Sequence, residues 1–98
     1  MSTLSLLLLL MSIPQGYGGS EWNNALLRWT TSSWAISYNV YRASAACPAT
    51  PNVQVASLLL VPQYVDHNLA TGSYCYAVTA VSSYGESDPS TVVGVTIP

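Results

Sequence analysis

Apolar and polar residues alternate along most of the chain after Ser20. Apolar residues recur at every second position in three segments, 27–29, 36–40 and 74–80. Because successive side chains of a β-strand point to opposite faces, each segment predicts a strand with one apolar face. The β-branched run 91–97 indicates a further strand near the end of the chain.

Turn signals separate these strands. They are clusters of Ser, Thr, Gly, Pro and Asn, and they lie at 30–33, 48–52, 70–73 and 82–89. No segment after residue 19 has the sustained apolar period of a capped helix. Short strands at roughly 8–12-residue spacing, joined by polar turns, predict an all-β fold in which antiparallel strands form a sandwich or a barrel.

The first nineteen residues have a different pattern from the rest. A short polar start is followed by the apolar stretch 6–11 and then by an exit rich in Pro and Gly. This order is typical of a secretory signal peptide, so we expect a signal-like hydrophobic leader over 1–19 and a domain over 20–98. The alternative is a first strand of the domain, with Leu6, Leu8 and Leu10 on one face.

Composition excludes two classes of partner. The chain has 98 residues, of which 50% are hydrophobic and 6% charged, and its net charge is −2. Its only basic residues are Arg28 and Arg42, which do not make the basic patch that nucleic acids or anionic membranes require. The longest apolar run, 4–11, is shorter than the roughly 20 residues of a spanning helix. We therefore expect no nucleic-acid partner and no membrane span in the mature domain.

Five motifs carry a family resemblance. They are Leu27-Arg28-Trp29, Tyr38 to Arg42, Tyr64-Val65-Asp66, Gly72 to Val81 and Gly85 to Ser90. In this order and spacing they resemble the successive strand motifs of a fibronectin type III domain, in the version often appended to bacterial secreted proteins. The resemblance covers 25–98. It implies an immunoglobulin-like, seven-stranded Greek-key sandwich in which strands A, B and E face strands C, C′, F and G.

The resemblance also implies roles for single residues. Trp29 corresponds to the core tryptophan of strand B, Tyr74 to the tyrosine-corner residue of strand F, and Asp66 to an aspartate that accepts hydrogen bonds from turn amides. Strand A is expected at 21–24. Together with the alternation, this predicts a core made of Leu27, Trp29, Ile36, Tyr38, Val40, Tyr64, Leu69, Tyr74, Tyr76, Val78 and Ala80.

The two cysteines favour a disulfide. Cys47 and Cys75 are an even pair in a chain with a leader-like start. Cys75 alternates with Tyr74 and Tyr76, so it points away from the core, and the family fold places the turn that holds Cys47 beside strand F. The alternative is two free thiols. The absence of Cys-x-x-Cys spacing disfavours a redox-active pair.

Ionisable residues offer little for catalysis. Asp66 and His67 are adjacent in a strand, so they point to opposite faces and do not form the carboxylate–imidazole pair of a hydrolase. No Gly-x-Ser-x-Gly motif presents a nucleophile. Glu86 and Asp88 are expected to be solvated loop residues, and the acidic residues lack calcium or zinc spacing. The sequence thus predicts no enzyme, no metal site and no cofactor.

Aromatic residues are the remaining candidates for binding. Trp34 in the B–C loop and Tyr84 in the F–G loop are expected at one end of the sandwich, and Tyr41 is expected to face outward beside Cys75. The alternative for Trp34 is a core position in phase with Tyr38.

These expectations combine in a non-catalytic extracellular module, secreted or at the cell surface. Such a module acts as a structural spacer or as a protein-binding domain of a larger assembly, and its expected partner is another protein or a second copy of the chain. The alternative function is a carbohydrate-binding accessory module that uses its exposed aromatic residues.

Overall fold

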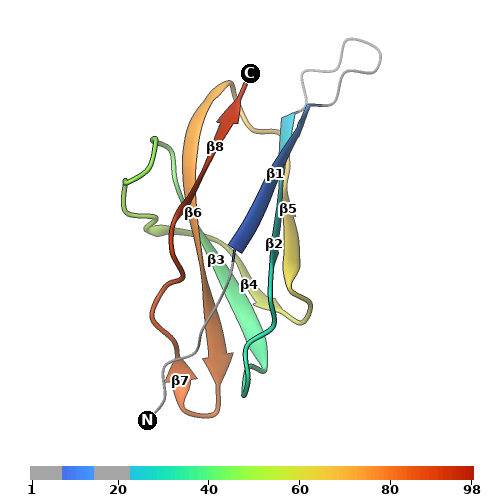
Figure 1. The fold of residues 1–98 in the computed structure, drawn as a ribbon, viewed down its shortest axis with the longest axis vertical. Helices are drawn as coiled ribbons and strands as arrows, with labels where there is room; N and C mark the ends of the chain where they lie inside the picture. The colour runs from blue at the N-terminus through green and yellow to red at the C-terminus, as the bar shows by residue number, and fades with distance from the viewer. Residues whose placement is uncertain (1–7, 15–22) are drawn as a thin grey trace.

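Two antiparallel β-sheets pack face to face in the computed structural model, which describes residues 8–14 and 23–98 (Figure 1). The strands in chain order are β1 (Leu8–Pro14), β2 (Asn23–Trp29), β3 (Ser37–Ala43), β4 (Val53–Leu59), β5 (Gln63–Asp66), β6 (Gly72–Ser82), β7 (Gly85–Glu86) and β8 (Val93–Ile97). The smaller sheet has the order β1-β2-β5. The larger sheet has the order β4-β3-β6, and both β7 and β8 pair with β6. The predicted all-β sandwich is confirmed.

The last strand of the larger sheet is interrupted between β7 and β8. Pro89 lies in the interruption and has no N–H to donate to a ladder. The hydroxyls of Ser87 and Ser90 accept hydrogen bonds from the amides of Ala80 and Val78, at 2.9 Å each. The serine amides in turn donate to the carbonyls of the same two residues. The two serines therefore supply hydrogen-bond partners for the backbone of β6 where strand pairing stops. Strands β7 and β8 act as two halves of a seventh strand.

Side-chain alternation along β3 and β6 builds the core. Tyr38 pairs with Ala80 and Val40 pairs with Val78, and these side chains face the smaller sheet. The Trp29 ring meets the Tyr38 ring edge to face, at 5.5 Å between centroids. The buried hydrophobic cluster consists of Ala25, Leu27, Trp29, Tyr38, Val40, Leu69, Tyr74, Tyr76, Val78, Ala80, Val95 and Ile97. Tyr64 is half-buried and packs against this cluster.

The expectation that Ile36 belongs to the core is wrong. Its side chain is 64% exposed, although it has the same parity as Tyr38. Strand β3 begins only at Ser37, and the facing strand β2 ends at Trp29, which already covers Tyr38. Ile36 therefore lies beyond the end of the facing sheet, where parity no longer implies burial.

The leader-like segment lies partly outside the described residues. The part that is described, 8–14, forms β1 and pairs antiparallel with β2, from Leu8 opposite Trp29 to Pro14 opposite Asn23. It therefore occupies the position of strand A, and the expectation of strand A at 21–24 is wrong because Asn23 and Asn24 open β2. An export role for 1–19 stays a prediction. Within the described ranges no helix is long and apolar enough to cross a membrane.

The predicted disulfide between Cys47 and Cys75 is present. Cys75 lies on the outer face of β6 and is fully buried, because the loop that follows β3 brings Cys47 over it. Cys47 also covers Gly94, the β8 partner of Cys75, where a Cβ would stand 3.6 Å from the Cys47 sulfur. The bond thus fastens the β3–β4 connection to the two strands at the centre and edge of the larger sheet.

Removing this disulfide should lower the free energy of unfolding by about 3–4 kcal/mol. The reason is that the bond closes a loop with a sequence separation of 28 and so restricts the unfolded chain. The measurement is urea unfolding of the double variant Cys47→Ala/Cys75→Ala against the oxidised protein. Dithiothreitol should destabilise the wild type and leave the double variant unchanged. Equal unfolding midpoints for the variant and the oxidised wild type would contradict the prediction.

Candidate functional site

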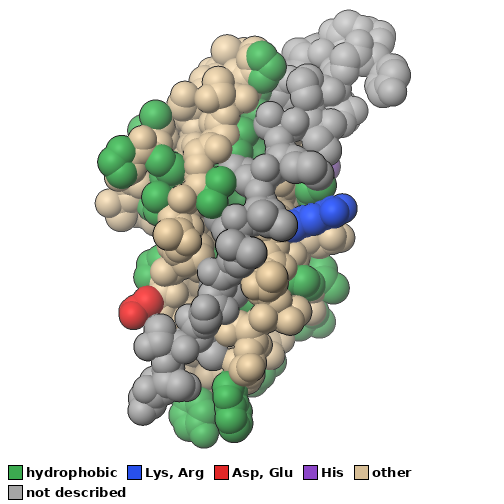
Figure 2. Space-filling model, in the orientation of Figure 1, with side chains coloured by type: hydrophobic (Ala, Val, Ile, Leu, Met, Phe, Trp, Pro, Cys, Tyr) green, Lys and Arg blue, Asp and Glu red, His purple; other side chains and the backbone are tan. Residues whose placement is uncertain are grey.

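Two exposed aromatic side chains meet at one end of the sandwich. Trp34 lies in the β2–β3 loop and is 68% exposed, and Tyr84 lies in the β6–β7 turn and is 72% exposed. Their rings contact edge to face, with centroids 6.3 Å apart and an interplanar angle of 69°. Figure 2 shows hydrophobic side chains gathered at the lower end of the molecule, where Figure 1 draws the β6–β7 turn. The structure therefore brings together two of the three aromatic residues predicted for binding.

Backbone geometry directs both aromatic rings outward. Trp34 has a φ of 72°, a left-handed conformation that residues other than glycine adopt rarely. The next two residues fasten the loop, since Ala35 donates to the Ser32 carbonyl and Ile36 donates to the Val81 carbonyl. The Tyr84 amide donates to the Ser82 hydroxyl at 3.0 Å, which holds the tight turn. The alternative in which Trp34 extends the core is contradicted by its exposure.

Tyr41 lies apart from this pair, on the outer face of the larger sheet. Its hydroxyl donates to Glu86 Oε2 at 2.5 Å. Asn39, the neighbour of Tyr41 on the same face of β3, donates to the same oxygen at 3.1 Å, and Thr79 of β6 donates to it at 2.5 Å. Gln54 of the edge strand β4 donates to the Tyr41 hydroxyl at 3.1 Å. One carboxylate oxygen therefore accepts three hydrogen bonds from side chains of two strands.

These hydrogen bonds change the acidity of both groups. The pKa of the Glu86 carboxyl is lowered, because hydrogen bonds from Thr79, Tyr41 and Asn39 stabilise the charged form. The pKa of the Tyr41 hydroxyl is raised, mainly because its proton is held by Glu86. Glu86 is exposed, as expected of a solvated residue, but it belongs to β7 and is held by three donors, so it is not a free loop residue.

A shallow hollow of about 220 Å³ lies beside this carboxylate. Its lining combines apolar walls with hydroxyl groups and consists of Tyr41, Pro51, Ala77, Thr79, Glu86, Ser87 and Pro89. Ala77 and Thr79 are buried floor residues of β6, and Pro89 belongs to the interruption between β7 and β8.

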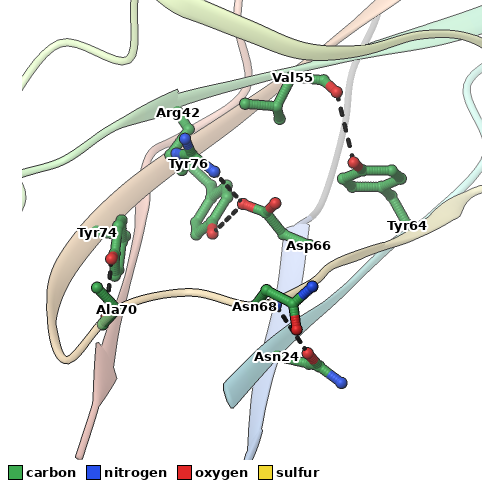
Figure 3. Close-up of polar contacts among 9 residues, drawn as sticks. All are labelled: Asn24, Arg42, Val55, Tyr64, Asp66, Asn68, Ala70, Tyr74 and Tyr76. Carbon is green, nitrogen blue, oxygen red and sulfur yellow. Dashed lines mark hydrogen bonds and ion pairs between the residues drawn. The ribbon is translucent and has the colours of Figure 1, made fainter. Parts of the chain in front are cut away.

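Asp66 makes a second polar cluster, inside the sandwich (Figure 3). Its Oδ2 accepts hydrogen bonds from Arg42 Nη1 at 2.8 Å and from the Tyr76 hydroxyl at 2.6 Å. Asp66 belongs to β5, whereas Arg42 and Tyr76 belong to the facing sheet. The resemblance implied that this carboxylate accepts from turn amides. Instead, its side chain bridges the two sheets, because the buried Tyr76 hydroxyl needs an acceptor at this depth.

Burial and charge act together in this cluster. Burial raises the pKa of the Tyr76 hydroxyl, and its hydrogen bond to Asp66 raises it further, so Tyr76 remains a neutral donor. Burial by itself would lower the pKa of Arg42, but the hydrogen bond and the charge of Asp66 outweigh it and raise the value. The Arg42 guanidinium also lies 5.8 Å from the centroid of the Tyr74 ring.

The tyrosine corner forms as the resemblance implies. The Tyr74 hydroxyl donates to the Ala70 carbonyl at 2.7 Å, across the turn that leads into β6 (Figure 3). Trp29 is buried on β2 at 4% exposure. His67 is exposed, while the Asp66 side chain is directed inward, so the two do not form a catalytic pair. Over residues 8–14 and 23–98, no group of three His, Cys, Asp or Glu residues is placed to hold a metal ion.

Comparison with known proteins identifies the fold family. No protein-family model matches the chain, and no curated protein matches it. A solved structure described as a Fn3-like protein from Clostridium thermocellum matches 97% of this chain and 88% of its own, at 29% sequence identity and a TM-score of 0.71. The chain is a fibronectin type III-like domain. Strands β1, β2 and β5 are its strands A, B and E, and β3, β4, β6 and β7–β8 are C, C′, F and G.

Glu86 is the site residue of this fibronectin type III-like domain that sequence reasoning missed. The alternation of side chains was the available signal, because it places Asn39, Tyr41 and Thr79 on the outward-facing side of their strands. Nothing in the local sequence says that the chain folds back so that Glu86 reaches these donors. That contact depends on the pairing of Val81 with Glu86 in the β6–β7 hairpin.

Replacing Asp66 by alanine should lower the free energy of unfolding by about 2–4 kcal/mol. The change leaves the Tyr76 hydroxyl and the Arg42 guanidinium without their acceptor inside the sandwich. Urea unfolding measures the effect. The control is Asp88→Ala, an exposed acidic residue whose loss should change stability by less than about 0.5 kcal/mol. Equal effects of the two variants would show that the interior cluster contributes nothing.

Acid should remove the stabilisation that Glu86 provides. Its pKa is lower in the folded protein than its ordinary value of 4.5, so its contribution is fully present above that pH. The contribution is lost as the pH falls below 4.5 and through the folded pKa. The measurement is the difference in unfolding free energy between wild type and Glu86→Gln from pH 7 to pH 3. This difference should shrink toward low pH, and a difference that is constant over the range would refute the assignment.

Proposed function

We propose that this fibronectin type III-like domain is a non-catalytic, protein-binding module of a secreted or surface-attached assembly, and that it contacts its partner through Trp34, Ile36 and Tyr84. The fold supports a non-enzymatic module in general. The observation that carries the proposal is the exposed aromatic pair at the β2–β3 and β6–β7 loop end.

Exposure of these three side chains favours a binding surface. They are 68%, 64% and 72% exposed, and all belong to two loops at the same end of the sandwich. A contiguous apolar patch on a small domain commonly marks an interaction site, and Trp and Tyr are enriched among the residues that contribute most to protein interfaces. The left-handed backbone of Trp34 supports the same interpretation, because strained conformations gather at functional sites.

The disulfide supports a location outside the cytosol. Bonds such as Cys47–Cys75 form and persist in oxidising compartments, and they are common in small secreted domains. The leader-like pattern of 1–19 adds no support, because 8–14 form β1 of the sandwich.

The geometry of β4 disfavours one route to self-association, edge-to-edge pairing of this strand with a second copy. Strand β4 is an edge of the larger sheet, but its pairing with β3 has two register shifts. Leu58 of β4 also has a left-handed φ of 56°. Bulges of this kind disrupt the regular row of N–H and C=O groups that edge-to-edge pairing needs.

Carbohydrate binding is the second candidate function. Trp34 and Tyr84 are exposed aromatic residues, as such a site needs, and Tyr41 lies partly exposed on the sheet face. The 69° angle between the Trp34 and Tyr84 rings does not make a flat surface on which a sugar ring stacks, and Tyr41 is engaged by Glu86. The geometry therefore favours a protein partner.

The test is capture of partners from the extracellular fraction of the native source, followed by affinity measurement with the captured protein. Trp34→Ala and Tyr84→Ala should each weaken binding by about 2 kcal/mol, which is about thirty-fold in Kd. The matched control is Val53→Ser, which removes an apolar side chain that is 54% exposed on β4, near the opposite end of β3.

Three outcomes would contradict the protein-binding proposal. The first is equal affinity of wild type and both aromatic variants. The second is equal loss with Val53→Ser. The third is glycan-array binding that disappears in Trp34→Ala or Tyr84→Ala without any captured protein, which would establish the carbohydrate alternative.

A further inference from the structure

The hollow beside Glu86 is separate from the aromatic loop end and has its own chemistry. Glu86 Oε2 is held by Asn39, Tyr41 and Thr79. Asn39 and Thr79 are buried, at 9% and 3% exposure, so two of the three donors are fixed parts of the sheet. No described residue donates a hydrogen bond to the second oxygen, Oε1. The carboxylate is therefore rigidly placed and keeps accepting capacity for another group.

Within residues 8–14 and 23–98, no basic side chain pairs with Glu86, whose side chain is exposed to solvent. The sequence contains two basic side chains, Arg28 and Arg42, and no lysine. Arg42 is paired with Asp66 on the opposite face of the sheet, and Arg28 lies on β2 in the other sheet. The lowered pKa of Glu86 means that this uncompensated carboxylate is ionised at neutral pH. A basic side chain that pairs with Glu86 therefore belongs to another molecule.

The walls of the hollow suit an aliphatic chain that ends in a positive charge. Pro51, Pro89 and Ala77 supply apolar surface, and the Tyr41 ring lies beside the carboxylate. Lysine and arginine bury their methylene stems on apolar surface while their charged ends meet a carboxylate or an aromatic face. A volume of about 220 Å³ is large enough for one such side chain.

We infer that this hollow is a binding site for a lysine or arginine side chain of a protein partner. The carboxylate of Glu86 receives the cationic group, and the Tyr41 ring and the two prolines cover its stem. A neutral sugar would match the hydroxyls of Thr79 and Ser87 but would leave the carboxylate unneutralised. The charge therefore favours the cationic side chain.

The test is an NMR titration of the ¹⁵N-labelled chain with N-acetyl-arginine amide and N-acetyl-lysine amide. At least one of the two should give saturable shifts of the amides of Ala77, Thr79 and Ser87. Glu86→Gln should weaken this binding at least ten-fold. Asp88→Asn is the matched control. It removes one negative charge two residues from Glu86, and the Asp88 side chain does not line the hollow, so this variant should bind the probe as the wild type does.

Several results would overturn the inference. N-acetyl-citrulline amide has nearly the shape of the arginine probe but lacks its charge. Equal affinity of the wild type for these two probes would overturn the inference. This comparison decides the matter even where Glu86→Gln does not fold. The inference would also be overturned if Asp88→Asn weakened binding as much as Glu86→Gln, or if the shifts did not saturate with either cationic probe. A third contrary result is that maltose, and neither cationic probe, shifts the same amides.

The result of the probe titration is independent of the proposed partner binding at the loop end. Trp34→Ala should leave the binding of the cationic probe unchanged, because Trp34 does not line the hollow. Conversely, loss of partner capture in Trp34→Ala gives no information on Glu86.

Discussion

The alternation of side chains along β6 is the constraint on which both faces of the larger sheet depend. This strand is buried from Tyr74 to Ala80, and it pairs with β3 on one side and with β7 and β8 on the other. Its even-numbered residues enter the core, and its odd-numbered residues carry the disulfide and the floor of the hollow. A shift of one residue in its register would exchange these two sets and place Thr79 and the Cys75 sulfur in the core.

Contacts between the two sheets differ along the length of the sandwich. Near the loop end, Trp29 packs on Tyr38 through apolar contact. Farther along, Asp66 crosses between the sheets to meet Arg42 and Tyr76. The polar cluster fixes the position of one sheet relative to the other more strictly than apolar packing does, because the Tyr76 hydroxyl is buried and must keep its acceptor. The relative position of the two sheets is therefore specified by hydrogen bonds as well as by burial.

Glu86 links the structural and functional parts of the larger sheet. It lies two residues after Tyr84, so its three hydrogen bonds hold the β6–β7 hairpin against the sheet while Tyr84 extends toward Trp34. The same carboxylate borders the hollow on the outer face. A single anchored acidic residue thus supports the position of the aromatic pair and supplies the negative charge of the second surface.

The sequence by itself determined an all-β fold of sandwich or barrel type, the core role of β6 and the cysteine pair, because alternation, turn residues and a count of two cysteines are local properties of the chain. The family resemblance selected the sandwich. Tertiary structure alone decided four matters: that 8–14 form strand A, that Ile36 lies beyond the end of the facing sheet, that Asp66 bonds across the sheets, and that Glu86 is anchored. Each depends on how strands that are distant in the sequence pair and pack. Parity gives the face on which a side chain lies, whereas only the packed structure gives the neighbour that it meets there.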